Sequence, residues 1–243
     1  MGEPSLRGQT VVVIGGSGGI GLETARLARA EGARVILTGR DPERLRRTAS
    51  ELDAASSAAF DATAPDSLER FFRELPTPID HVMVTAGRPT YGPILEMDLS
   101  EVRRNLDEHL GVAIRVARQA VGKVRPGGTL IFMSGTGARR PGIGLALAAT
   151  FTAAFPALVA NLALEIAPVR VNLIAAGFVD TGLSATILGD QLEARRAQLR
   201  ETLPIRRVVG PADVARLAVH LMTNTALTGA TYDVDGGQQL LPG

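Results

Sequence analysis

The chain has no cysteine, no tryptophan, only two tyrosines and a single lysine, Lys123, among its 243 residues. Without cysteine it can form no disulfide, and it has no thiol nucleophile or thiolate metal ligand. A formal net charge of +1 gives no electrostatic reason to expect nucleic acid or a membrane surface as a partner. No apolar run approaches the length of a membrane span, and the short polar start is not a signal peptide. We therefore predict a cytoplasmic protein that binds neither nucleic acid nor a membrane.

A glycine-rich turn near the start is the most informative stretch of the chain. Four β-branched apolar residues, 11–14, lead into Gly15-Gly16-Ser17-Gly18-Gly19-Ile20-Gly21, and apolar residues at helical spacing follow over 22–32. This pattern predicts a buried strand, a tight turn and a helix whose first N–H groups favour a phosphate. Two dinucleotide-binding fingerprints fit the same letters, GxGxxG from Gly16 and GxxxGxG from Gly15. The alternative is a glycine turn that holds no ligand.

Strand and helix patterns alternate along the whole chain. The predicted strands cover 11–14, 34–38, 58–62, 79–87, 129–134, 169–174 and 230–234. The main predicted helices cover 66–75, 99–124, 146–167 and 211–222, and residues 181–200 form a mobile helical flap. Helix 146–167 is apolar nearly all round, which predicts that it is buried. Together these patterns predict one α/β domain over residues 1–243, a Rossmann-like doubly wound parallel sheet of about seven strands with helices on both faces.

The end of the second strand bears on the choice of dinucleotide. An acidic residue there would bind the ribose 2′-hydroxyl of NAD, whereas an arginine suits the 2′-phosphate of NADP. Gly39 stands where the acid is expected, and Arg40 follows it. Asp41 with Pro42 makes a good N-cap and first-turn pair for the next helix. We predict NADP rather than NAD; the alternative is a solvated Arg40 with Asp41 contacting the ribose.

These landmarks fall in order with those of a known family. The chain resembles the short-chain dehydrogenase/reductases, in the branch with ketoacyl-carrier-protein reductases, through its glycine turn, Asp61, Thr85-Ala86-Gly87 and the segments 169–172 and 233–237. The resemblance covers essentially the whole chain and implies a homo-oligomer, a tetramer or dimer, formed through helices 99–124 and 146–167. It also implies a site for NADP lined by residues from several strand ends: Gly15, Ser17, Gly18, Ile20, Arg40, Asp61, Ala62, Ala86 and Gly87. Gly177, Val179 and Thr181 belong to a segment that resembles the one holding the nicotinamide carboxamide.

The catalytic residues that the resemblance implies are not found at the matching positions. Reductases of this family share an Asn, a Ser, a Tyr and a Lys four residues after the Tyr, which together deliver a proton to the developing alkoxide. The matching positions here hold His109, Gly135, Ala148 and Thr152. Counting forward from Gly135 and counting back from Glu165 both give Ala148. No Tyr-x-x-x-Lys occurs anywhere in the chain, so the tetrad is predicted to be absent.

A few side chains remain as candidates for chemistry. His109 could act as a general acid, because an imidazole titrates near neutral pH; the alternative is a satisfied, partly buried histidine. Strand alternation is expected to point Ser134 away from the site. Tyr91 could lean over the pocket or pack on Pro93.

Other charged or ligating residues give weaker signals. Arg88, Arg139 and Arg140 lie on loops at the same sheet edge, where they could bind an acidic group or remain solvated. His81 and His220 have no partners at metal-ligand spacing, so we predict no metal site.

Two functions remain open on the sequence alone. The first is an atypical NADP-dependent oxidoreductase that acts on an unknown small carbonyl or enoyl substrate, with the proton supplied by His109, water or the substrate. The second is a pseudoenzyme that binds NADP(H) as a sensor or partners an active homologue.

Overall fold

A computed structural model describes residues 5–139 and 141–241. One parallel sheet of seven strands runs through the molecule in the order β3-β2-β1-β4-β5-β6-β7. This order reverses direction between β1 and β4, which creates the crevice where doubly wound sheets bind ligands. The strands are β1 (Thr10–Ile14), β2 (Arg34–Gly39), β3 (Ser56–Ala59), β4 (Ile79–Val84), β5 (Val124–Gly135), β6 (Arg170–Ala176) and β7 (Thr231–Val234). The predicted fold class is confirmed.

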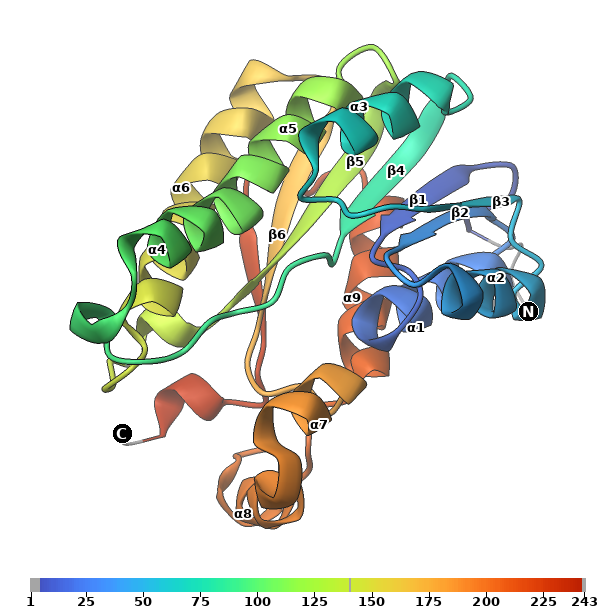
Figure 1. The fold of residues 1–243 in the computed structure, drawn as a ribbon. Helices are drawn as coiled ribbons and strands as arrows, with labels where there is room; N and C mark the ends of the chain where they lie inside the picture. Colours follow the sequence, from blue (N-terminus) through green and yellow to red (C-terminus); the bar gives the residue numbers. More distant parts are fainter. Residues whose placement is uncertain (1–4, 140, 242–243) are drawn as a thin grey trace.

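Helices cover both faces of this sheet (Figure 1). Alternate residues of the buried strands feed two separate apolar cores, because successive side chains point to opposite faces. The core that contains Val12 and Val82 packs against α3 (Pro65–Glu74), α5 (Val112–Ala120) and α6 (Ala146–Glu165). The core that contains Val11 and Val13 packs against α1 (Gly19–Ala30), α2 (Pro42–Glu51) and α9 (Pro211–Thr223).

Two further helices, α7 (Gly182–Leu188) and α8 (Leu192–Thr202), project beyond the sheet between β6 and α9 (Figure 1). They occupy the segment predicted to be a helical flap. Thr181 begins α7 with a reciprocal capping box to Ser184, which satisfies N–H groups that a helix start otherwise leaves without partners. The predicted cap of α2 is also confirmed, because Asp41 accepts from the backbone N–H groups of Glu43 and Arg44.

The predicted helical stretch over 99–124 contains a π-helical turn and ends earlier than expected. The helix α4 (Leu99–Leu106) passes through a π-helical turn, Asp107–Gly111, into α5, which ends at Ala120. Gly122 then adopts a left-handed conformation with φ of 76°, which ends a helix without strain at glycine. Val124 already pairs with Ile79 as the first residue of β5. The predicted helical stretch is therefore present over 99–120, with a π-helical turn inside it, and the prediction was wrong only at its end.

Two other local predictions need correction. The third strand is Ser56–Ala59, so Asp61 lies two residues beyond its end, in the loop that leads to α3. The helix α6 is not buried all round: Phe151 and Val159 face the sheet, whereas Leu164 is 79% exposed. By length and composition α6 could cross a membrane, which is weak evidence in a helix whose inner face packs on the sheet. The apolar outer face of α6 is therefore exposed and does not belong to the core.

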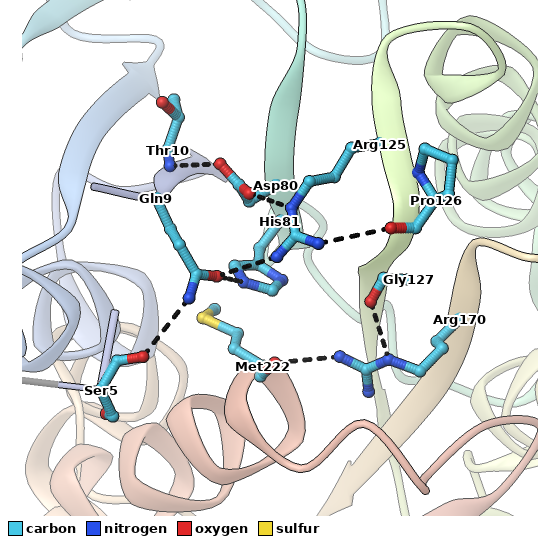
Figure 2. A network of polar contacts seen from close by, with 10 residues as sticks. All are labelled: Ser5, Gln9, Thr10, Asp80, His81, Arg125, Pro126, Gly127, Arg170 and Met222. Atoms are coloured by element: carbon cyan, nitrogen blue, oxygen red, sulfur yellow. Dashed lines mark hydrogen bonds and ion pairs between the residues drawn. The ribbon is translucent and has the colours of Figure 1, made fainter. Parts of the chain in front are cut away.

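A polar network lies at the amino ends of the central strands (Figure 2). His81 of β4 is 1% exposed, and its Nε2 lies 2.7 Å from the Gln9 Oε1. Asp80 accepts from the Thr10 N–H at 2.7 Å and forms an ion pair with Arg125. The only lysine, Lys123, is at this edge as well, where its Nζ donates to the carbonyl groups of Arg73 and Leu75.

Candidate dinucleotide and substrate site

The glycine turn between β1 and α1 is held by its own packing. A Cβ on Gly21 would overlap the carbonyl oxygen of Gly15 and lie 2.6 Å from the Thr85 Oγ1. Thr85 in turn donates to the carbonyl groups of Ile14 and Gly15 at 3.2 and 3.1 Å. Gly15 and Gly21 are therefore required for the strand and helix to approach each other, whether or not a ligand binds.

Gly18 has no such internal reason. Within the described residues, nothing lies within 4 Å of a Cβ built on Gly18, and its φ is near 180°. It also begins α1 without a side-chain cap among those residues. The first N–H groups of α1 are thus left open beside an uncluttered backbone, which suits a phosphate group at this point.

Gly39 and Ser17 form the surface next to this turn. Ser17 is buried at 7% exposure, and a Cβ on Gly39 would lie 2.7 Å from the Ser17 Oγ. An acidic side chain at position 39 therefore has no room while Ser17 keeps its place. Arg40 follows as an exposed side chain, and the Asp41 carboxylate is occupied by capping α2, which lowers its pKa.

Asp61 and Ala62, which are predicted to line the NADP site, lie farther along the same edge. Asp61 is exposed, and its Oδ1 accepts from both the N–H and the hydroxyl of Thr63 at 2.9 Å. This side chain therefore shapes its own turn. Ala62, next to it, is buried at 5% exposure.

A cavity of about 650 Å³ lies beyond the carboxyl ends of β4, β5 and β6. Six of the residues predicted to bind the cofactor line it: Ile20, Ala86, Gly87, Gly177, Val179 and Thr181. The Thr181 side chain lies 3.6 Å from a Cβ built on Gly19, so the loop after β6 meets the glycine turn. The other six, Gly15, Ser17, Gly18, Arg40, Asp61 and Ala62, lie outside the lining of this cavity.

His109 stands in the π-helical turn and lines the cavity. Its Nδ1 lies 2.8 Å from the carbonyl oxygen of Asn105. Its ring stacks on Phe151 with centroids 3.9 Å apart and planes inclined by 15°. A π-turn inside a helix is often found at functional sites.

The remaining positions of the implied tetrad surround the same cavity without an acid or base. Ala148 and Thr152 of α6 and Gly135 of β5 all line it. The Thr152 hydroxyl donates back to the carbonyl of Ala149 at 3.1 Å. These three residues contribute space and a hydroxyl, but no group that titrates near neutral pH.

The other candidate side chains differ in whether they line the cavity and in what they contact. Ser134 also lines the cavity, although its hydroxyl is covered and has no hydrogen-bond partner among the described residues. Tyr91 lines the cavity with 52% of its surface exposed, and partial burial raises its pKa. Arg139 is held by an ion pair with Asp233 and by the Gln239 side chain. Arg88 is exposed, and Arg140 lies outside the described residues.

Sequence reasoning missed much of the cavity wall. The helix α7 contributes Leu183, Ile187 and Leu188 to the lining. Their positions i, i+4 and i+5 could have predicted an apolar face on the helical flap. Phe178 and Gln238 also line the cavity, and the Gln238 Oε1 accepts from the Phe178 N–H at 2.8 Å. No signal in the sequence indicated that residues after β7 would line this cavity.

Comparison with known proteins places this geometry in a family of nicotinamide-dependent oxidoreductases. The family model described as enoyl-(acyl carrier protein) reductase matches residues 15–239. The chain is 32% identical to 3beta-hydroxysteroid dehydrogenase 1 of Eggerthella lenta, over 98% of this chain and 96% of that protein. It is 28% identical to the short-chain dehydrogenase/reductase ATR9 of Stachybotrys chlorohalonatus, over 96% of this chain and 98% of that one.

The solved structures agree with the sequence comparisons. A small-chain dehydrogenase in complex with NADPH superposes with a TM-score of 0.83 at 26% identity, over 96% of this chain and 99% of that one. The chain therefore belongs to the short-chain dehydrogenase/reductase family.

Proposed function

We propose that this protein is an NADP(H)-dependent oxidoreductase that reduces a small carbonyl or enoyl substrate without the Asn-Ser-Tyr-Lys tetrad. The observation that carries this proposal is the cavity in which Gly87, the 177–181 loop and His109 face one another. When bound, the dinucleotide would supply the hydride. The protein's share is to bind and orient both molecules and to provide a proton.

The residues along the sheet edge fit this dinucleotide. The glycine turn with Gly15, Ser17, Gly18 and Ile20 would hold the pyrophosphate. Asp61 and Ala62 would border the adenine, and Ala86 and Gly87 the adjoining ribose. Gly177, Val179 and Thr181 would meet the carboxamide.

NADP is favoured over NAD by the arrangement at the end of β2. The crowding of position 39 by Ser17 excludes the acid that would read the ribose 2′-hydroxyl. Arg40 can form a charge-assisted hydrogen bond with a 2′-phosphate. Among relatives, the small-chain dehydrogenase cited above was solved with NADPH.

The cavity also favours a substrate that needs little help with proton transfer to oxygen. Most of its lining is apolar, from Pro89 and Leu145 to Leu183 and Ile187. Loss of a positioned acid–base group typically costs about 10²–10⁴-fold in rate. Reduction of an activated double bond tolerates this loss better than reduction of a simple ketone, and the matching family model carries an enoyl reductase description.

Dissociation constants test the cofactor assignment. Wild type should bind NADPH more tightly than NADH, and Arg40→Ala should weaken NADPH about 10- to 100-fold, since it removes a charge-assisted hydrogen bond. Arg46→Ala, an exposed arginine on α2, is the matched control and should leave both constants unchanged. Equal affinities of the wild type for NADPH and NADH would contradict the assignment of Arg40.

Turnover tests the reaction. NADPH oxidation across a panel of carbonyl and enoyl compounds should reveal a substrate. Tight NADPH binding with no turnover on any of them would favour the second candidate, a pseudoenzyme. That candidate rests on Ala148 and Thr152, which stand where the resemblance implies a tyrosine and a lysine.

We further propose that the protein is a cytoplasmic homo-oligomer, a tetramer or dimer. The oligomer is supported by exposed apolar side chains on three helices, α4, α5 and α6, that lie on one side of the molecule (Figure 1). Leu99 of α4, Ile114 of α5 and Leu164 of α6 are 69%, 43% and 79% exposed. Burial against another copy would remove this apolar area from water.

A further inference from the structure

We propose that His109 exchanges a proton with the substrate through Nε2 alone, and that Phe151 and the Asn105 carbonyl are the groups that position its ring. This inference rests on the proposed function and identifies the acid–base group of that reaction. It assigns a positioning role to Phe151, a residue that the sequence alone did not single out.

The tautomer follows from one hydrogen bond. The partner of Nδ1, at 2.8 Å, is a backbone carbonyl oxygen, and a carbonyl can only accept. Nδ1 must therefore carry the hydrogen in the neutral ring, which leaves the lone pair on Nε2. In the protonated ring both nitrogens donate, so the one proton that comes and goes is on Nε2.

The ring edge that carries Nε2 faces the reaction space. A Cβ built on Gly87 would lie 3.6 Å from the His109 Nε2, and Gly87 follows β4 at the cavity wall. On its face the ring lies against Phe151, which is 4% exposed. Rotation of the ring about its χ angles would break both the stack and the bond to Asn105, so Nε2 stays directed at the cavity.

Asn105 is itself fixed in place. It is 4% exposed, and its Nδ2 donates to the Thr90 Oγ1 at 2.6 Å. That bond ties α4 to the loop after β4, which carries Tyr91 and Pro89 in the cavity wall. The carbonyl that holds His109 is therefore anchored to the same wall that would contact a substrate.

His109 shares the cavity with few ionisable side chains. The ionisable groups near His109 are two ion pairs on its own helix and two cavity-lining side chains: Asp107–Arg115, Arg104–Glu108, Tyr91 and Arg195. No aspartate or glutamate is present among the described residues that line the cavity. Among the described residues the ring is therefore held by the stack with Phe151 and by the Asn105 carbonyl.

The proton step balances with a reduced nicotinamide dinucleotide as reductant. Hydride adds to the electrophilic carbon, and the π electron pair moves to the oxygen of a carbonyl or to the α-carbon of an enoyl group. That atom forms a bond to the proton of Nε2, and the N–H electron pair remains on Nε2. The ring becomes neutral with its Nδ1–H intact, and solvent returns a proton to Nε2.

The first test measures the ring directly and does not depend on turnover. Long-range ¹⁵N–¹H spectra of the labelled protein, assigned with His109→Gln, should show the Nδ1–H tautomer above the midpoint of the titration, with Nε2 taking up the proton below it. Phe151→Leu should allow the two tautomers to exchange, because the stack no longer holds the ring. A Nε2–H tautomer, or rapid averaging of the two tautomers in wild type, would overturn the positioning argument.

The second test uses the turnover number. His109→Gln should lower kcat for NADPH oxidation by about 10²–10⁴-fold, and Phe151→Leu should lower it about 10-fold because the ring is no longer held in line. Phe155→Leu, a buried phenylalanine one turn farther along α6 that packs on Phe132, is the matched control and should keep kcat.

The two failures are distinguishable. Turnover that survives His109→Gln overturns the acid–base role and leaves the proposed function standing. Absence of wild-type turnover with every substrate overturns the proposed function and the acid–base role together, while the spectra still decide how the ring is held.

Discussion

The buried histidine at the amino edge of the sheet should make the stability of this protein depend on pH. Burial and the nearby charges of Arg170 and Arg125 outweigh the attraction of Asp80, and they lower the pKa of His81 to about 3 (Figure 2). Its Nε2 is paired with Gln9, whereas its Nδ1 has no partner among the residues described. The folded protein therefore holds this imidazole neutral, and a second ring proton would have no acceptor.

The size and sign of the effect follow from linkage. An unfolded histidine has a pKa near 6.5, so between pH 6.5 and 3 the unfolded chain binds a proton that the folded chain does not. Stability is lost as pH falls through that window, and the loss from His81 alone is about 2 kcal/mol between pH 7 and pH 5. Above pH 7 the contribution is flat.

Denaturant unfolding at pH 7, 6 and 5 measures this loss. His81→Gln keeps an amide that can donate to Gln9 but does not titrate, so its free energy of unfolding should fall by about 2 kcal/mol less than that of wild type over this range. His220→Gln changes an exposed histidine on α9 and should keep the wild-type slope. Identical slopes for wild type and His81→Gln would refute the idea that the folded protein excludes the proton.

Two other predictions concern the glycine turn and the outer surface of α6. Gly21→Ala should lower the free energy of unfolding by about 1–3 kcal/mol, because its Cβ would overlap backbone at Gly15, whereas Gly18→Ala should keep the melting temperature and weaken NADPH binding. If Gly21→Ala melts like wild type, the turn is looser than its packing indicates. Leu164→Glu should reduce the mass seen by sedimentation, whereas Ile143→Glu, a 98% exposed residue in the loop before α6, should not. An unchanged mass for Leu164→Glu would argue against α6 as an interface.

The features that could be predicted from sequence are those with a local physical cause. The glycine turn needs small residues at Gly15 and Gly21 because the helix and strand touch there. The cap of α2 depends on Asp41 and Pro42 alone. Most of the strands carry their own apolar runs, whereas the edge strand β3, with its two exposed serines, was displaced.

The features that could not be predicted depend on contacts between distant residues. The π-turn at Asp107–Gly111 has no residue pattern that distinguishes it from ordinary α-helix. The apolar residues all round α6 predict that the helix is buried, but they do not show whether it is buried by the sheet alone or also by another molecule. Strand alternation predicted that Ser134 points away, whereas the end of β5 brings Met133, Ser134 and Gly135 to the cavity lining together.

The ionisable groups that line the cavity limit how a proton can reach a substrate there. The one lysine is held by two carbonyl groups at the far edge of the sheet, so its amine does not reach the cavity. Three described lining residues ionise: Tyr91, Arg195 and His109. An arginine does not release its proton near neutral pH, and partial burial moves the pKa of Tyr91 farther from it. Imidazole is the remaining group whose ordinary pKa lies in that range. An enzyme built on this cavity must therefore move its proton through His109 or take it from solvent or from the substrate itself. The effect of Phe151→Leu on kcat distinguishes the first route from the other two.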